Sequence, residues 1–436
     1  MTLDLDRDLV RRDDGLLALG TLLDPDAFVV AVNRALRAPR VASGRLVYLR
    51  YKPGTNCLAA YRLEVAGGEA FAYAKAYHRR DIDKYRKALE RLGTEASDLG
   101  VAGLALDDVM TVVHGFPNDR VLSRLPRLFT SQGRRARFLE RVLPDRTDLW
   151  GAHLETVRYK AERRFVGRLD VGGRPRALLK LATDRDFARA HQGLAAVAKQ
   201  TSVAVPAVLG RSKRSGALVT GWLEGTPLDA LGEPRVAATR LAGQTLARLH
   251  RVRPGALRRH SREAHALGVV ASARFVTFVL PHLGGHIKPL ALAIAAASLE
   301  GPEAMVTLHG DFSSDQVIVR DGAASLIDFD QASVGEPAVD LGTFIAQVRR
   351  DALTDQLDEH SVGALEDALL DGYDADLPRL DLQIAAALLR LAPHAFRDQH
   401  PAWPDLTERL VDAAHGAFTR WEACQDATLT PVTSPE

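Results

Sequence analysis

Four oxygen-bearing side chains lie in one short stretch of the chain: Asp311, Gln316, Asp328 and Asp330. Two apolar runs and the turn-forming pair Asp321-Gly322 separate the first two from the last two, so the stretch is predicted to form a β-hairpin. Carboxylate and amide oxygens at the base of such a hairpin suit a divalent cation that keeps some water and is completed by phosphate oxygens. Phosphoryl transfer needs such a cation, together with an acid that accepts the proton of the attacking hydroxyl.

The wider motif makes this interpretation more specific. Residues 309–342 contain HGDFSSDQ, then IDFD, then GEPAVDLG. This order and spacing resemble the catalytic signature of the aminoglycoside phosphotransferase and choline kinase family, small-molecule relatives of the protein kinases. Most members have Asn where this chain has Gln316, and maltokinase-like members are similar in carrying Gln there. A lone His-Gly-Asp is an ordinary turn, but the four matched elements together are specific.

The resemblance implies a role for each matched residue. Asp311 would be the catalytic base, and Gln316 and Asp328 would be the magnesium ligands. Asp330 would be a second metal ligand or a contact to the acceptor.

Two further matched residues would be structural. The resemblance implies that His309 braces the catalytic loop and that Asp340 holds that loop together. ATP and Mg²⁺ are the cofactors it implies.

An internal repeat precedes this motif. The strings LRYK, YRLEV, GG and AK follow one another within residues 49–75, and VRYK, GRLDV, GG and LK follow one another within residues 157–180. The offset stays at about 105 to 108 residues through further matches. Each copy is predicted to form a strand, a glycine-containing turn, a strand that ends in Lys, a helix, and more strands. This order resembles the sheet-rich lobe that covers the nucleotide in the family.

The second copy runs directly into the catalytic part of the chain, so we expect it to bind the nucleotide. Lys180 lies in an apolar strand, where an ammonium needs an anionic partner, and is the implied phosphate-binding lysine. Thr220 and Trp222 belong to the predicted hinge, whose backbone would hold adenine. The turn at 160–164 contains no glycine, so its backbone cannot approach phosphate closely; Arg163 or its neighbour Arg164 would attract the phosphates instead.

The partner of the phosphate-binding lysine is left open. Family members carry a helix glutamate about fifteen residues after this lysine, and the second copy has none at that distance. Either Gln192 or one of the nearby aspartates Asp184 and Asp186 replaces it, or the lysine is held differently. The first copy keeps the spacing as Lys75 and Glu90, a common pattern that leaves open whether the first copy binds anything.

The predicted fold class is α+β. We expect a bilobal protein-kinase-like fold with an additional N-terminal module that resembles the nucleotide-binding lobe, and a mainly helical C-lobe. The predicted organisation is an N-terminal helical segment, a cap module with its linker, the nucleotide-binding lobe, the helical lobe and a disordered tail, at residues 1–44, 45–150, 151–232, 233–426 and 427–436 respectively.

Composition excludes several classes of function. The apolar fraction of 46% and the net charge of +2 are typical of a globular protein without a membrane partner. No secretory signal or apolar run long enough to span a bilayer is present, so a cytoplasmic location is expected. The two cysteines form no metal or redox motif. Basic residues are dispersed and not interleaved with aromatic ones, so no nucleic-acid partner is expected.

The sequence thus predicts an ATP-dependent phosphotransferase that acts on a hydroxyl of a small molecule, most consistent with a sugar, an amino sugar or an aminoglycoside. From residue 351 onward, the chain contains about seventeen acidic side chains and five basic ones. This excess of negative charge would attract a cationic acceptor. Two alternatives stay open: a pseudokinase or nucleotide-binding interaction module, and a kinase of a peptide or other natural-product hydroxyl. The oligomeric state is not predicted.

Overall fold

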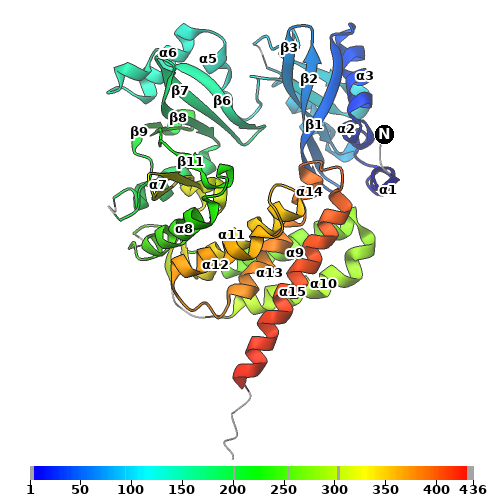
Figure 1. Cartoon of the computed structure of the whole chain (residues 1–436). Helices are drawn as coiled ribbons and strands as arrows, with labels where there is room; N and C mark the ends of the chain where they lie inside the picture. Colours follow the sequence, from blue (N-terminus) through cyan, green and yellow to red (C-terminus); the bar gives the residue numbers. More distant parts are fainter. Residues whose placement is uncertain (1–3, 94, 200–201, 254, 302–304, 430–436) are drawn as a thin grey trace, which may run out of the picture. The chain divides into compact units, whose positions relative to one another are not determined.

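The computed structural model describes residues 4–429, except for 94, 200–201, 254 and 302–304. The chain forms two compact units (Figure 1). The unit that we call the sheet unit comprises Met1–Phe187, Leu209–Gly221 and Phe396–Pro401. The other, the helical unit, comprises Ala188–Val208, Trp222–Ala395 and Ala402–Glu436.

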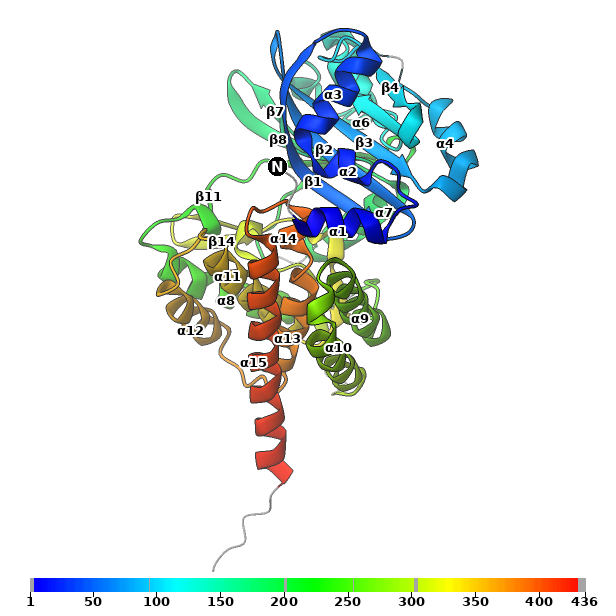
Figure 2. The same ribbon diagram turned by 90° about the vertical axis from the view of Figure 1, so that its right-hand side faces the viewer.

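Three short helices open the sheet unit: α1 (Asp4–Arg12), α2 (Leu19–Leu23) and α3 (Pro25–Leu36). The side chain of Asp24 caps α3, because its Oδ1 accepts hydrogen bonds from the backbone nitrogens of Asp26 (3.0 Å) and Ala27 (3.1 Å). Figure 2 shows α2 and α3 on one face of the first sheet. Phe28 of α3 stacks on Tyr61 of that sheet, so the helix is anchored by buried aromatic surface.

The first module is built on a five-stranded antiparallel sheet. Its strands are β1 (Val41–Lys52), β2 (Asn56–Val65), β3 (Gly68–Tyr77), β4 (Gly103–Leu106) and β5 (Thr111–Gly115). They lie in the order β1-β2-β3-β5-β4, and α4 (Ile82–Leu89) follows β3. Two linking helices, α5 (Pro126–Phe129) and α6 (Gln132–Val142), lead to the second module.

The second module repeats this topology. Its strands are β6 (His153–Lys160), β7 (Arg164–Val171), β8 (Arg174–Ala182), β9 (Val208–Ser212) and β10 (Ala217–Gly221). Their order, β6-β7-β8-β10-β9, is that of the first sheet, and α7 (Asp184–Val197) follows β8 as α4 follows β3. Phe138 and Leu139 of α6 pack with Leu179 and Leu181 of β8 in one core. The repeat in the sequence therefore corresponds to two sheets of the same strand order.

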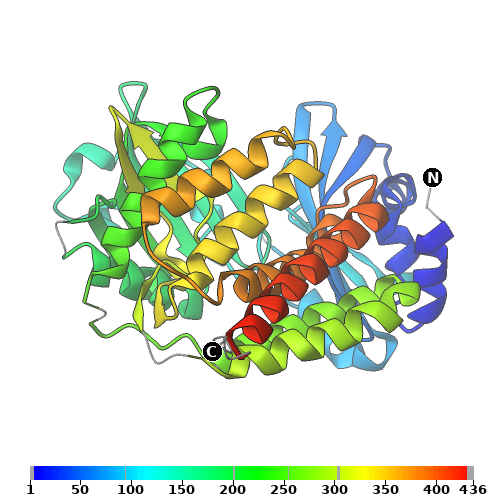
Figure 3. The ribbon, with the colours of Figure 1, turned by 60° about the horizontal axis from the view of Figure 1, so that its bottom comes forward.

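The helical unit carries the catalytic motif among long helices. These are α8 (Arg235–His250), α9 (Arg262–Val279), α10 (Gly284–Leu299), α11 (Ala338–Leu353), α12 (Ser361–Tyr373), α13 (Leu380–Leu391) and α15 (Trp403–Leu429). The short α14 (His394–Arg397) precedes the last of them. Helices α9 and α10 pack along each other, as do α13 and α15 (Figure 3). Their shared core includes Leu246, Phe344 and Leu388.

Two small sheets complete the helical unit. One contains β11 (Thr226–Pro227), β13 (Val317–Arg320) and β14 (Ala323–Leu326), and the other pairs β12 (Val306–Leu308) with β15 (Ser333–Gly335). The predicted tail begins inside α15, which continues through Ala427 to Leu429. The remainder of the predicted tail lies outside the described residues. None of the helices in the described part of the chain is long and apolar enough to cross a bilayer.

Candidate active site

The predicted hairpin is present in the helical unit. Strands β13 and β14 pair antiparallel from Val317 opposite Leu326 to Arg320 opposite Ala323. Asp321 and Gly322 form the turn between them, both with positive φ (48° and 73°), as two-residue hairpin turns require. The turn chemistry visible in the sequence was therefore enough to predict this element.

The two expected magnesium ligands flank the open end of the hairpin. Gln316 ends a 3-10 turn (Ser314–Gln316) and is buried. Its carbonyl oxygen accepts a hydrogen bond from the backbone nitrogen of Ile327 at 3.0 Å, which brings it opposite the residue before Asp328. Asp328 adopts a left-handed backbone conformation with φ 63° and ψ 58°. This conformation is uncommon for residues other than glycine.

His309 ties the loop that carries Asp311 to the same end of the hairpin. Its Nε2 donates to the carbonyl oxygen of Ile327 at 2.8 Å, and its ring packs against Phe312 and Phe329. Gly310 follows with φ 81°, and a Cβ at this position would meet the carbonyl oxygen of Gln331 at 2.2 Å. The loop therefore needs glycine both for its conformation and for its close approach to the neighbouring backbone.

Asp340 at the start of α11 fixes the backbone of this loop. Its fully buried carboxylate accepts hydrogen bonds from the backbone nitrogens of His309 (2.7 Å to Oδ2) and Gly310 (2.8 Å to Oδ1). Burial alone would raise the pKa of Asp340, but the hydrogen bond and charge of His250, together with the other donors, outweigh burial and hold the pKa below its usual value. These contacts support the structural role expected for both His309 and Asp340.

The residues that bind Asp340 from the other side could not be recognised from any sequence motif. His250 at the end of α8 donates from Nε2 to Asp340 Oδ2 at 3.1 Å, since a carboxylate only accepts hydrogen bonds. Its Nδ1 lies 2.8 Å from the hydroxyl of Tyr373 in α12. A buried chain of polar groups thus connects the catalytic loop to two helices that are distant in sequence.

Two charged residues near the motif were also missed. Glu336, in the GEP part of the motif, accepts a hydrogen bond from Arg379 at 2.9 Å, and Arg379 also donates to the carbonyl oxygens of Ala297 and Glu300. Glu336 is therefore a structural link to α10 and α13. Arg390 of α13 lies close enough for its positive charge to interact with the negative charge of Asp311.

The ligand set fits a magnesium ion held jointly with phosphate. Within the part of the chain that the structure describes, no three His, Cys, Asp or Glu side chains gather as a metal site by themselves. A pair of protein oxygens from Gln316 and Asp328, completed by phosphate and water, is how Mg²⁺ is commonly bound next to nucleotides.

The expected nucleotide contacts belong mainly to the sheet unit. Lys180 is half-buried on β8, on the face opposite Leu179 and Leu181, which enter the core. Thr220 lies on β10 opposite Leu178 of β8 and is buried. Trp222, the first residue after β10, is half-buried at the start of a segment of the helical unit.

The glycine-free turn between β6 and β7 is strongly basic. Arg163 is exposed at this turn, as a phosphate contact requires. Burial, followed by the positive charges of Arg158, Arg164 and Arg163, lowers the pKa of Lys160 to about 8. Such mutual repulsion is relieved by an anion, which supports the expectation that this turn attracts phosphate.

The tip of the same turn points toward the first module, which the sequence did not predict. Glu162 is buried, and its carboxylate receives a hydrogen bond from Lys75 at 2.5 Å. Glu90, whose spacing from Lys75 resembles that of a lysine–glutamate pair, is exposed at the end of α4. The partner of Lys75 is therefore Glu162 of the other module rather than Glu90.

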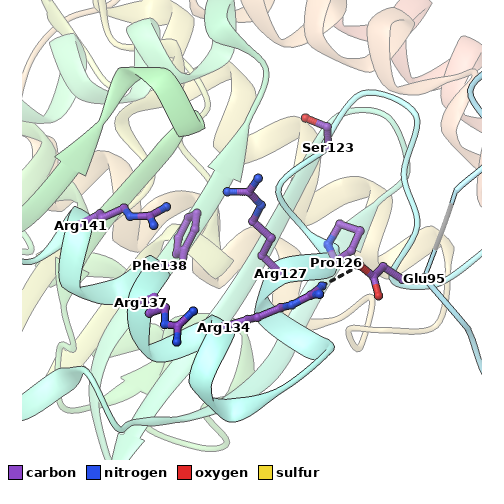
Figure 4. Close-up of a pocket in the computed structure, with 8 residues that line it drawn as sticks. All are labelled: Glu95, Ser123, Pro126, Arg127, Arg134, Arg137, Phe138 and Arg141. Carbon is purple, nitrogen blue, oxygen red and sulfur yellow. Dashed lines mark hydrogen bonds and ion pairs between the residues drawn. The ribbon is translucent and has the colours of Figure 1, made fainter.

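A second basic feature of the sheet unit is a cavity of about 460 Å³ beside α5 and α6 (Figure 4). Arg127, Arg134, Arg137 and Arg141 line it together with Phe138. Arg134 is paired with Glu95 at 2.8 Å. All four arginines are exposed, so solvent screens their charges.

Residues 153–382 match the model of the phosphotransferase enzyme family. The match covers more than half of the chain, from the start of β6 to α13. It includes the β13–β14 hairpin and the catalytic-loop residues His309 and Asp311. The chain therefore belongs to this family and is a small-molecule phosphotransferase, as the sequence predicted. The α+β, protein-kinase-like fold class is confirmed, and the first module lies before the matched region.

A comparison with curated protein sequences gave no match. Among solved structures, an aminoglycoside phosphotransferase from Streptomyces rimosus is 22% identical and covers 59% of this chain and 97% of its own (TM-score 0.42). A choline/ethanolamine kinase family protein from Mesorhizobium loti is 15% identical, with coverages of 67% and 99% (TM-score 0.48). A macrolide 2'-phosphotransferase from Brachybacterium faecium is 19% identical, with coverages of 60% and 91% (TM-score 0.41). Membership of the family rests on the sequence match.

Proposed function

We propose that the protein transfers the γ-phosphoryl group of ATP, with Mg²⁺, to a hydroxyl of a sugar, an amino sugar or an aminoglycoside. The observation that carries this proposal is the construction of the catalytic loop. Asp340 holds the backbone on one side of Asp311, and His309 links that loop to the hairpin that carries Gln316 and Asp328. The backbone next to Asp311 and next to Asp328 is thus braced, which is what positioning of a phosphoryl group demands.

In this proposal Asp311 performs the proton transfer. Its exposed carboxylate orients the acceptor hydroxyl and takes its proton late in a loose transition state. Arg390 keeps a positive charge near that carboxylate. Gln316 and Asp328 would hold Mg²⁺, which supplies positive charge against the phosphate oxygens, and half-buried Asp330 would be a further metal ligand or an acceptor contact.

The nucleotide would be held by the second module. Lys180 would pair with its phosphates, and the basic turn with Arg163 would attract them. The backbone between Thr220 and Trp222 would hold adenine. This assignment is supported by the family match, which begins at the first strand of this module and leaves out the first module.

Acidic side chains next to the hairpin favour an acceptor that carries amino groups. Asp229, in the 3-10 turn Leu228–Ala230, has a pKa raised by burial and by the negative charge of Asp315. A cationic group of the acceptor placed between these two carboxylates would relieve their repulsion. An amino sugar or an aminoglycoside offers such a group, whereas a neutral sugar does not.

The test is an ADP-release screen with Mg²⁺ over neutral sugars, amino sugars and aminoglycosides. The proposal predicts saturable ADP formation with at least one of them and none when EDTA replaces the metal. ATP-dependent thermal stabilisation without turnover on any acceptor, and turnover on a peptide hydroxyl alone, would each contradict the proposed acceptor class.

A further inference from the structure

One face of the first sheet is covered by the 160–164 turn of the second module. Ala161, at the tip of the 160–164 turn, is buried against Leu58, Ala60 and Tyr73 of that sheet. Glu162 follows with φ 57°, and only 3% of its side chain is exposed. In the second module, the corresponding face of the sheet is the one that carries Lys180.

Glu162 brings one carboxylate to three cations of the first module. Its Oε2 accepts hydrogen bonds from Lys75 (2.5 Å) and Arg50 (3.2 Å), and its Oε1 accepts one from the Nε of Arg120 (2.6 Å). Burial would raise the pKa of Glu162, but the hydrogen bond from Arg120 and the charge of Lys75 overcome it and bring the pKa to about 2. Among these four hydrogen-bonded side chains, one negative charge thus faces three positive ones.

The backbone of this turn is also fastened to the first module. Asp119 accepts hydrogen bonds from the backbone nitrogen of Glu162 (2.8 Å) and from the hydroxyl of Tyr159 (2.7 Å). The other oxygen of Asp119 accepts hydrogen bonds from the backbone nitrogens of Val121 and Leu122, both at 2.7 Å. The position of the turn therefore depends on groups of the first module.

Lys75 and Arg120, two of the cations that bind Glu162, line a cavity of about 280 Å³. Its lining includes five cationic side chains and one acid: Lys75, Lys84, Lys87, Arg91, Arg120 and Asp81. Asp81 is paired with Lys84 at 2.8 Å. Among the described residues, no hydrogen bond or ion pair is found for the side chains of Lys87 and Arg91. The hydroxyl of Thr55 and the amide of Asn56 add polar groups to the same lining.

We propose that this cavity binds a small molecule that carries a phosphate or pyrophosphate group, and that this anion competes with Glu162 for Lys75 and Arg120. A phosphate group has more charge and more acceptor oxygens than the carboxylate it displaces, so it neutralises the cations more completely. Displacement of Glu162 loosens the 160–164 turn in the second module. The binding site is independent of the proposed kinase activity.

The cavity beside α6 differs from the cavity of the first module in the exposure of its cations. It is larger and also rich in arginine, but all its cations are exposed and one is already paired with Glu95 (Figure 4). In the first module, by comparison, 13% of the Lys75 side chain and 25% of the Arg120 side chain are exposed. Partial burial strengthens their attraction for an anion, and a built-in carboxylate already occupies part of the site.

The probe for the test is pyrophosphate, titrated in EDTA by isothermal calorimetry against the full chain. Glu162→Gln removes the competing charge while keeping the shape of the side chain, and is expected to tighten pyrophosphate binding by about tenfold. Lys87→Ala/Arg91→Ala removes two exposed cations from the cavity and is expected to weaken binding by about tenfold. Arg137→Ala/Arg141→Ala, in the cavity of Figure 4, is the matched control and is expected to leave binding unchanged.

Two further variants separate this site from the nucleotide site. Lys180→Met and Asp311→Asn are expected to keep the tightening caused by Glu162→Gln, even where they abolish ADP formation. A thermal-shift experiment covers the case of a weakly folded Glu162→Gln protein, because pyrophosphate should then raise its Tm more than that of the parent.

Two results would overturn the proposal. One is pyrophosphate binding that is unaffected by Glu162→Gln and by Lys87→Ala/Arg91→Ala. The other is binding that disappears with Arg137→Ala/Arg141→Ala or with Lys180→Met, which would assign the anion to the α6 cavity or to the nucleotide site.

Discussion

Asp340 and Gly310 are 30 residues apart in the chain, yet the carboxylate of the first accepts a hydrogen bond from the backbone nitrogen of the second at 2.8 Å. The other oxygen of Asp340 binds the backbone nitrogen of His309. Two consecutive backbone groups directly before Asp311 are therefore held by one buried acid. The conformation of the catalytic loop therefore depends on this contact.

Asp340→Asn is predicted to destabilise the protein by about 2–4 kcal/mol, because the new amide nitrogen would face a backbone N–H group in a buried site. Urea unfolding at neutral pH measures this change. Asp371→Asn is the control, since Asp371 is exposed and its pair with exposed Arg240 contributes at most about 1 kcal/mol. Equal unfolding midpoints for the two variants would contradict the role of Asp340.

Gly310→Ala is predicted to lower the free energy of unfolding by at least about 2 kcal/mol and to reduce turnover strongly. The new Cβ would lie 2.2 Å from the carbonyl oxygen of Gln331, in addition to the strain of a positive φ. Gly322→Ala, in the hairpin turn, has a similar φ of 73° but no atom within 4 Å of the added Cβ. It is expected to show only the backbone strain, about 1 kcal/mol, with turnover retained.

The carboxylate of Glu162 is predicted to make the free energy of unfolding depend on pH. Its pKa in the folded protein, about 2, lies below the ordinary value of 4.5, so its contribution is fully present above about pH 4.5 and is lost as the pH falls toward 2. The contribution is about 3 kcal/mol at neutral pH. The difference in unfolding free energy between the parent and Glu162→Gln should therefore shrink between pH 5 and pH 3. A constant difference over that range would mean that the carboxylate is not held by its cations.

Lys180→Met is predicted to weaken ATP binding by about tenfold or more while leaving the fold intact, because the half-buried ammonium is the proposed partner of the phosphates. Calorimetric titration with ATP and Mg²⁺ measures the affinity. Lys213→Met, an exposed residue of the same unit, is the control and is expected to bind ATP like the parent. Unchanged affinity in Lys180→Met would remove this lysine from the site.

Features that depend on neighbouring residues in the chain were predictable from the sequence. The pair Asp321-Gly322 identified the hairpin turn, and the constant offset of the repeat anticipated two sheets of the same strand order. The family motif likewise identified the chain as a phosphotransferase. Each of these signals lies within one element or in a fixed spacing along the chain, so they could be recognised without knowing how the elements pack.

Contacts between distant segments were not predictable. His250 and Tyr373 meet Asp340 only because α8, α11 and α12 pack together, and neither residue belongs to a recognisable pattern. The spacing of Lys75 and Glu90 is that of a local pair, but Lys75 is bound by Glu162 instead. Glu162 reaches Lys75 from 87 residues further along the chain, which requires the docking of one module on the other.

The most direct test of the account is the turnover of Asp311→Asn. With ATP, Mg²⁺ and an acceptor identified by the screen, we predict that ADP formation falls by about a thousandfold or more, which corresponds to about 4 kcal/mol of transition-state stabilisation. ATP affinity and the unfolding midpoint should stay close to those of the parent. ADP formation at the parental rate would show that Asp311 is not the base and would contradict the proposed chemistry.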